Sequence, residues 1–403
     1  MTDVRPASRA LVAVLAMIFA IAPLSMDMYL PAVPAMGQAL HTSIANVQLT
    51  IAMFMLGLGT GTLLFGPLSD RLGRRRPLLT GISVFVLSAI GCAWSVSIGW
   101  LIGFRFLQGI GVTGGQVVVY ALLADLYGAR EMSRLTSLLQ MVSSVAPMLA
   151  PLIGGYLLLA FSWPAIFVVL AGYGVLVLCV AMRLVPETRS LEARAHSRAE
   201  SPGGSYLAVL RNRPLMRVAV VCAFGTSTFA TYLSNASRLF IEDFGISPQR
   251  FGYYFAANVV GLTIAGFLNR RLLKRHAPEW VLKRACVMLA ISGCLFVLLS
   301  ALYRHNYWPV LIALFLVVSC FPVIGANAMA LAQGHDRPRA GAVAAVVGAG
   351  NQAVGASAAI VSGALNNGTP LPMALTILVS AVLALLMLRW SLKRSPASVS
   401  PAP

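Results

Sequence analysis

Long apolar stretches alternate with short polar ones along almost the whole chain. A transmembrane α-helix needs about 20 mostly apolar residues to cross the hydrocarbon core of a membrane. Many stretches reach about this length, and their repetition predicts an all-α membrane protein with twelve transmembrane helices. The predicted spans are 10–31, 46–66, 77–95, 99–123, 133–160, 164–185, 214–238, 250–269, 283–303, 307–332, 340–365 and 371–391.

The longest polar stretch divides this pattern into two halves of six spans. It is rich in Pro, Gly and Arg, a composition typical of a linker. The segments 66–72 and 266–272 share four of seven residues, and each follows the second span of its half, which indicates an internal duplication. We therefore expect a six-helix lobe over 1–185, a cytoplasmic linker over 186–213, a second six-helix lobe over 214–391 and a disordered tail over 392–403.

The composition agrees with a membrane protein and changes how its charge is interpreted. Hydrophobic residues make up 58% of the chain and charged residues 10%, yet the formal net charge is +18. In a soluble protein this charge would suggest nucleic-acid binding. Here 26 of the 30 Lys and Arg residues fall in the loops and termini of one side, which predicts that both termini are cytoplasmic. We expect contact with membrane lipid and no binding of nucleic acid.

Motifs for enzymatic chemistry are missing from the sequence. The six cysteines lie within apolar runs and form no CxxC pair, so we interpret them as buried small side chains. No metal-ligand cluster, phosphate-binding loop or hydrolase triad is found. We predict a protein that is not an enzyme and that needs no metal or other cofactor.

One acid stands out inside the first span. Asp27 is the only ionisable residue between Arg9 and His41, and Pro23 and Pro31 flank it at positions where they can bend the helix. A carboxylate at membrane depth is costly and commonly marks an ion or substrate path. We interpret Asp27 as a proton-coupling group of a transporter. The alternative is an acid near the outer helix end that meets water.

The fourth span carries a cation. Arg105 is charged at any working pH and needs an anion or a polar cavity inside an apolar helix, unless it reaches the membrane interface. Gln108, Val112 and Gln116 follow at helical spacing and give this helix a partly polar face, which favours a cavity.

Span seven has a similar polar face. It is formed by Thr228, Tyr232 and Asn235, and we expect it to line the cavity opposite Asp27. The alternative is that these side chains only form hydrogen bonds between helices.

Two further segments combine charge or proline with glycine. In the loop after span two, Gly66, Asp70 and Gly73 are spaced more specifically than in a random basic loop, and Asp70 can pair with a nearby arginine or cap a helix. Gly73 permits a tight turn. In span five the spacing of Pro and Gly predicts a bend and a close approach of a neighbouring helix, at positions Pro147, Pro151, Gly154 and Gly155.

These segments resemble motifs of the major facilitator superfamily. The loop G-x-L-x-D-R-x-G-R-R at 66–75 resembles the signature between its spans two and three, and 101–111 and 146–155 resemble the span-four and span-five motifs of its proton antiporters. Further segments resemble the Bcr/CflA branch, which includes bicyclomycin and chloramphenicol exporters. They are 25–34, 69–71, 125–127, 186–188 and 327–330.

The resemblance implies a role for each matching residue. Asp27 would couple protons to substrate, and Arg105 would sense or tune its protonation. Asp70, Arg71 and Arg74 would form a latch at the inner gate, with Asp125 as a partner. Many relatives carry an arginine before that last aspartate, whereas this chain has Ala124, so the charge balance of its latch differs.

The resemblance implies a major facilitator fold and alternating access. We expect a monomer in the bacterial inner membrane that exports small amphipathic drugs in exchange for protons. One rival hypothesis is export of an endogenous metabolite such as a siderophore or an amino-acid derivative. A second rival, a non-transporting sensor or scaffold, would need a soluble signalling domain, and the sequence has none.

Overall fold

The computed structural model describes residues 9–190, 194, 202–303 and 306–393. Within this part of the chain, twelve helical segments are long and apolar enough to cross a membrane, which confirms the twelve predicted spans. Much of the predicted linker and the tail from 394 onward lie outside the described residues.

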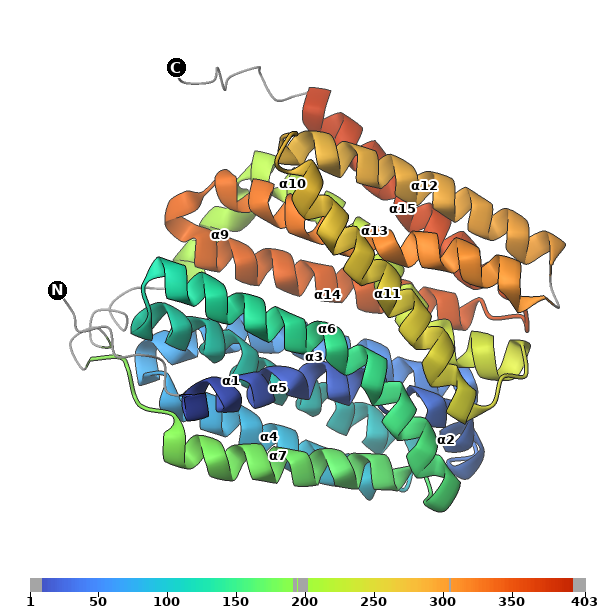
Figure 1. The fold of residues 1–403 in the computed structure, drawn as a ribbon, viewed down its shortest axis with the longest axis horizontal. Coiled ribbons are helices and arrows are strands. Elements are labelled where there is room, and N and C mark those ends of the chain that lie inside the picture. Colours follow the sequence, from blue (N-terminus) through green and yellow to red (C-terminus); the bar gives the residue numbers. More distant parts are fainter. Residues whose placement is uncertain (1–8, 191–193, 195–201, 304–305, 394–403) are drawn as a thin grey trace.

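The first six spans form one lobe, drawn in blue to green in Figure 1. The first span consists of three consecutive pieces, and the other five are single helices. They are α1 (Arg9–Asp27), η1 (Leu30–Ala32) and α2 (Val33–Ala39), then α3 (Ile44–Leu72), α4 (Arg75–Ala93), α5 (Ile98–Leu126), α6 (Ala129–Ala160) and α7 (Pro164–Leu184).

A short helix of the predicted linker precedes the second lobe, whose seventh span ends in a π-helix and whose eleventh begins with a 3-10 turn. The segments are α9 (Pro202–Arg211), α10 (Arg213–Ser237), η2 (Arg238–Asp243), α11 (Pro248–Leu272), α12 (Pro278–Leu302), α13 (Tyr307–Gly334), η3 (Arg337–Arg339), α14 (Ala340–Ala364) and α15 (Leu371–Lys393).

The two lobes meet along two helix pairs. α3 packs against α14, and α6 packs against α11, which runs obliquely across the junction in Figure 1. We call the end of the molecule that carries α9 and both chain ends the α9 end, and the opposite end the α2 end (Figure 1).

Glycines permit the close packing within the first lobe. A Cβ atom added to Gly57 of α3 would lie 2.1 Å from the Phe106 carbonyl oxygen of α5, and one added to Gly109 would lie 2.2 Å from the Phe54 carbonyl oxygen. The two backbones therefore touch directly, a form of helix packing common in membranes. This contact holds α5, and with it Arg105, in a fixed position.

Several helices continue past the apolar stretches that predicted them. The first span runs to Ala39 instead of 31, because Pro31 lies at the start of a 3-10 turn, where its missing N–H costs little. α3 runs to Leu72 and ends at Gly73, whose φ of 92° is easily adopted only by glycine. Hydropathy marks the membrane-embedded part of a helix, so it cannot locate helix ends that extend into the polar region.

Candidate functional site: a buried charge pair, a cavity between the lobes and a polar latch

Arg105 is completely buried and is held by aromatic rings. Its guanidinium carbon lies 4.2 Å from the ring centre of Tyr29 and 4.3 Å from that of Phe54. Nη1 donates to the Ser25 carbonyl at 2.9 Å and to Gln108 Oε1 at 2.7 Å. Nε and Nη2 are buried without a hydrogen-bond partner. The charge is therefore stabilised by π faces and two acceptors while two of its donor atoms remain unsatisfied.

Asp27 lies beside this cation as the last residue of α1. Its residue exposure is 5%, so it is neither in lipid nor on the surface. Arg105 of α5 and Tyr232 of α10 both act electrostatically on its carboxylate, although no ion pair between Asp27 and Arg105 is formed in the described structure. Because α10 belongs to the second lobe, Asp27 is located at the junction between the lobes.

The polar face predicted on α10 is buried in the same junction. Thr228 donates back to the Gly225 carbonyl at 2.8 Å. Asn235 accepts a hydrogen bond of 3.4 Å from Gln48 of α3. The hydroxyl of Tyr232 is buried and has no hydrogen-bond partner among the described residues. This helix thus brings polar groups against the first lobe near the α2 end.

A cavity of about 430 Å³ separates the lobes farther from the α2 end. Of the seven residues predicted to line a substrate cavity, Gln116 lies in its wall, and the other six are buried in the closed junction. α3, α5, α10, α13 and α14 contribute the lining residues: Met55, Leu58, Thr62, Thr113, Gln116, Thr226, Ala230, Phe321, Pro322, Gly325, Ala326, Gly348, Asn351 and Gln352.

A second cavity of about 630 Å³ lies between the first one and the α9 end. The two share Thr62, so they adjoin along α3. Tyr206 of α9 lines the second cavity, and its hydroxyl donates to the Leu63 carbonyl at 3.1 Å. Together the two cavities form a path from the α9 end to the middle of the molecule, whereas the lobes are packed together at the α2 end.

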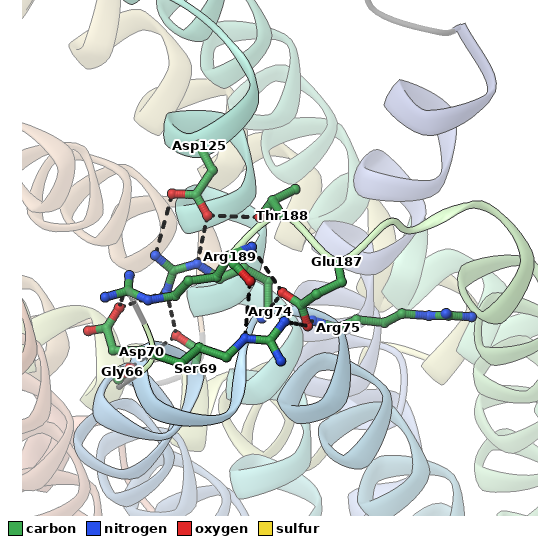
Figure 2. A network of polar contacts seen from close by, with 10 residues as sticks. Gly66, Ser69, Asp70, Arg74, Arg75, Asp125, Glu187, Thr188 and Arg189 are labelled. Carbon is green, nitrogen blue, oxygen red and sulfur yellow. Dashed lines mark hydrogen bonds and ion pairs between the residues drawn. The ribbon is translucent and has the colours of Figure 1, made fainter. Parts of the chain in front are cut away.

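Arg74 lies at the centre of a polar latch at the α9 end, shown in Figure 2. Its Nε donates to Asp125 at 2.8 Å, and its Nη1 donates to Asp70 at 2.8 Å and to Ser69 at 3.0 Å. The Arg74 side chain is 7% exposed and thus shielded from water, which strengthens these charge-assisted bonds. The latch joins the end of α3 to the end of α5 through the loop at Gly73.

The segment after α7 supplies latch residues to which we assigned no role from sequence. Arg189 donates to Asp70 at 2.9 Å, and Thr188 donates to Asp125 at 2.8 Å. Glu187 accepts the backbone N–H groups of Arg74 and Arg75 at 2.8 and 3.3 Å and so caps the start of α4 (Figure 2). The Pro-Glu-Thr sequence at 186–188 was the available signal, but sequence spacing does not show that it folds back onto the loop after α3.

Glu187 remains charged because its surroundings favour the carboxylate. Burial alone would raise its pKa, but the backbone donors of Arg74, Arg189 and Arg75 and the nearby charge of Arg194 hold the pKa below its ordinary value. A lowered pKa adds stability above the ordinary pKa of the group, and this is lost as the pH falls through the lowered value. The capping interaction is therefore complete at neutral and mildly acidic pH.

Asp70→Asn is expected to slow transport by roughly fivefold while leaving substrate affinity unchanged, since the latch is remote from the first cavity and removing the charge weakens its bonds by about 1 kcal/mol. Turnover and dissociation constant are measured separately in reconstituted protein. Glu131→Gln is the matched control, because Glu131 pairs at 3.5 Å with Arg134, whose side chain is 80% exposed. A wild-type rate in Asp70→Asn would contradict a gating role for the latch.

The Pro and Gly residues predicted in span five lie at the junction. Pro147 and Pro151 are inside α6. A Cβ atom added to Gly154 would lie 1.8 Å from the Met28 carbonyl oxygen, and one added to Gly155 would lie 2.6 Å from the Pro248 carbonyl oxygen of α11. α6 therefore contacts the segment after Asp27 on one side and the second lobe on the other.

The described residues contain no group of three or more His, Cys, Asp or Glu side chains that could hold a metal ion. All six cysteines are free. The groups available for function here are one buried acid, one buried cation, uncharged polar side chains and the latch.

Comparisons with known proteins agree with this architecture. The family model of the Major Facilitator Superfamily matches residues 15–333 and 235–403. Among solved structures, the D-xylose-proton symporter superposes with a TM-score of 0.75, covering 96% of this chain and 98% of that one. At 16% sequence identity this likeness supports the fold alone.

Two relatives narrow the assignment. The chain is 30% identical to a bicyclomycin resistance protein homolog of Haemophilus influenzae, over 90% of this chain and 91% of that protein. It is 35% identical to a chloramphenicol resistance protein of Pseudomonas aeruginosa, over 64% of this chain and 60% of that protein. The chain is a multi-pass membrane transporter that belongs to the major facilitator superfamily, in its Bcr/CflA branch.

Proposed function

We propose that this transporter exports small amphipathic drugs in exchange for protons, by alternating access, across the bacterial inner membrane and with both termini in the cytoplasm. The observation that carries the proposal is the buried pair of Asp27 and Arg105 at the closed end of a path between the lobes. The names of the two relatives support drugs as cargo.

The proposed cycle starts from the arrangement in which the cavities lead to the α9 end. Asp27 is then deprotonated, and its charge offsets that of Arg105 while the junction around η1 and α10 stays closed. Substrate enters the first cavity from the cytoplasm. In the outward-facing state Asp27 takes up a proton from outside, and substrate leaves.

Coupling in this scheme is indirect, because Asp27 does not line the cavity. α5 supplies the connection: Arg105 bonds to Gln108, and Gln116 lies on the same helix face two to three turns away, in the cavity wall. A change in the charge balance at Asp27 shifts Arg105 and therefore α5. Coupling through one rigid element with two arrangements is a physical route by which two sites can communicate.

The proposal is tested with purified protein in sealed liposomes loaded with acidic buffer. Chloramphenicol, taken from the name of one relative, serves as the first cargo. We expect its accumulation to depend on the pH difference, to collapse when a protonophore is added, and to be mirrored by proton release from the lumen. Accumulation that ignores the pH difference would overturn proton coupling.

A further inference from the structure

The cavity between the lobes has no ionisable side chain in its wall. All its lining residues belong to the described part of the chain, and they comprise threonines, amides and apolar or aromatic residues. Its volume of about 430 Å³ is within the usual range for sites that bind small molecules. The wall therefore contains no fixed counter-charge for an ionic ligand.

The three threonines in the wall offer hydrogen-bond acceptors. Each hydroxyl already donates its proton to a backbone carbonyl of its own helix: Thr62 at 2.8 Å, Thr113 at 2.9 Å and Thr226 at 2.7 Å. A hydroxyl that has donated its only proton still carries acceptor lone pairs. These positions therefore suit donor groups of a ligand.

Three amides add donors as well as acceptors. Gln116 comes from α5, and Asn351 and Gln352 come from α14, so both lobes contribute. Asn351 Nδ2 has a long contact of 3.3 Å to the Cys222 sulfur, and its Oδ1 is buried without a partner. A buried amide oxygen without a partner costs free energy that a donor on a ligand would recover.

The charged groups nearest the cavity are already engaged or buried. Asp27 and Arg105 lie in the closed junction, with exposures of 5% and 0%. At the other end Asp70 and Arg74 line the second cavity, but they are bonded to each other at 2.8 Å. A ligand in the first cavity thus meets dipoles and apolar surface, with charges only beyond its two ends.

We propose that this cavity selects uncharged small molecules that carry hydroxyl and amide groups beside an aromatic part, and that it discriminates against permanently charged lipophilic cations. The inference rests on the proposed function, because it names the cargo class of the same transporter. Moving an ion from water into a site without a counter-charge costs solvation free energy that dipoles recover incompletely. An uncharged ligand with both donors and acceptors avoids this cost and satisfies the amides.

The test is equilibrium binding to purified wild-type protein in detergent, at one pH and without any gradient. Radiolabelled chloramphenicol is the uncharged probe, and tetraphenylphosphonium is the cationic probe. We expect the uncharged probe to bind roughly tenfold more tightly or better. Equal or tighter binding of the cation, or no binding of either probe, would overturn the inference.

Variants connect the selectivity to the cavity wall. Asn351→Leu and Gln352→Leu are expected to weaken chloramphenicol binding by about fivefold or more. Gln352→Glu is expected to raise tetraphenylphosphonium affinity by a similar factor, because it adds the missing counter-charge. Gln38→Leu, an exposed position on α2 outside both cavities, should change neither affinity. Unchanged affinities in all three wall variants would contradict the proposal.

Folding failure and failure of the proposed function remain distinguishable from these outcomes. Thermal unfolding of each variant shows whether it is intact, and the gain of cation binding in Gln352→Glu is a result that misfolding cannot mimic. Selective binding without pH-driven accumulation would remove proton coupling and leave this inference standing. Proton-coupled transport of the cation in preference to chloramphenicol would do the reverse.

Discussion

Asp27→Asn is expected to abolish proton-driven accumulation while leaving substrate binding nearly intact. A one-for-one exchange supports about tenfold accumulation per pH unit, since one unit corresponds to about 1.4 kcal/mol. The amide cannot exchange protons, so the ratio should fall to about 1 in the variant. Binding should persist because Asp27 does not line the cavity. Accumulation ratios and dissociation constants, measured side by side, check both parts.

The choice of control makes this result specific. Glu242→Gln also removes a carboxylate near the α2 end, but Glu242 is part of the ion pairs around Arg238 and its side chain is 30% exposed. It should keep the wild-type accumulation ratio. Undiminished pH-driven accumulation in Asp27→Asn would show that another group carries the proton.

Hydropathy and local chemistry predicted much of this molecule. The number of spans follows from apolar length alone, because lipid leaves the backbone no alternative to helices of that length. The importance of Asp27 follows from its isolation within an apolar run, and the pairing of Asp70 with a nearby arginine follows from charges four residues apart on one chain segment.

Contacts between distant segments could not be predicted in this way. Glu187 caps α4 although 113 residues separate it from Arg74, and no periodicity reports such a return of the chain. Thr228, Tyr232 and Asn235 were expected to line the cavity, but the structure buries them in the closed junction. Polar residues on a membrane helix avoid lipid in either case, so sequence cannot distinguish a cavity wall from a helix interface.

The closed junction near the α2 end is held together mainly by packing. Two side-chain hydrogen bonds cross it, from Gln48 to Asn235 and between Tyr156 and Tyr253, and both are long at 3.4 Å. Weak polar contacts allow the lobes to separate at low cost, as an alternating mechanism needs. Close contacts of small residues must then define the closed state, and Gly154 makes the tightest of them.

Gly154→Ala is accordingly expected to destabilise this arrangement by about 1–3 kcal/mol and to reduce transport by about tenfold or more. The added Cβ would lie 1.8 Å from the Met28 carbonyl oxygen, so α6 must move away from the segment that follows Asp27. Backbone atoms on one side of the contact leave no flexible side chain to yield. The unfolding temperature in detergent and the pH-driven transport rate in liposomes measure the two effects.

Gly172→Ala in α7 is the matched control, because a Cβ atom there meets nothing within 4 Å. It should leave both quantities unchanged, and the extra methyl group favours a helix slightly over glycine. If Gly154→Ala instead behaved like Gly172→Ala, α6 would have room at Met28 and the closed junction would not depend on this contact. If stability fell but transport did not, the contact would support the fold without defining the state in which Asp27 is shielded.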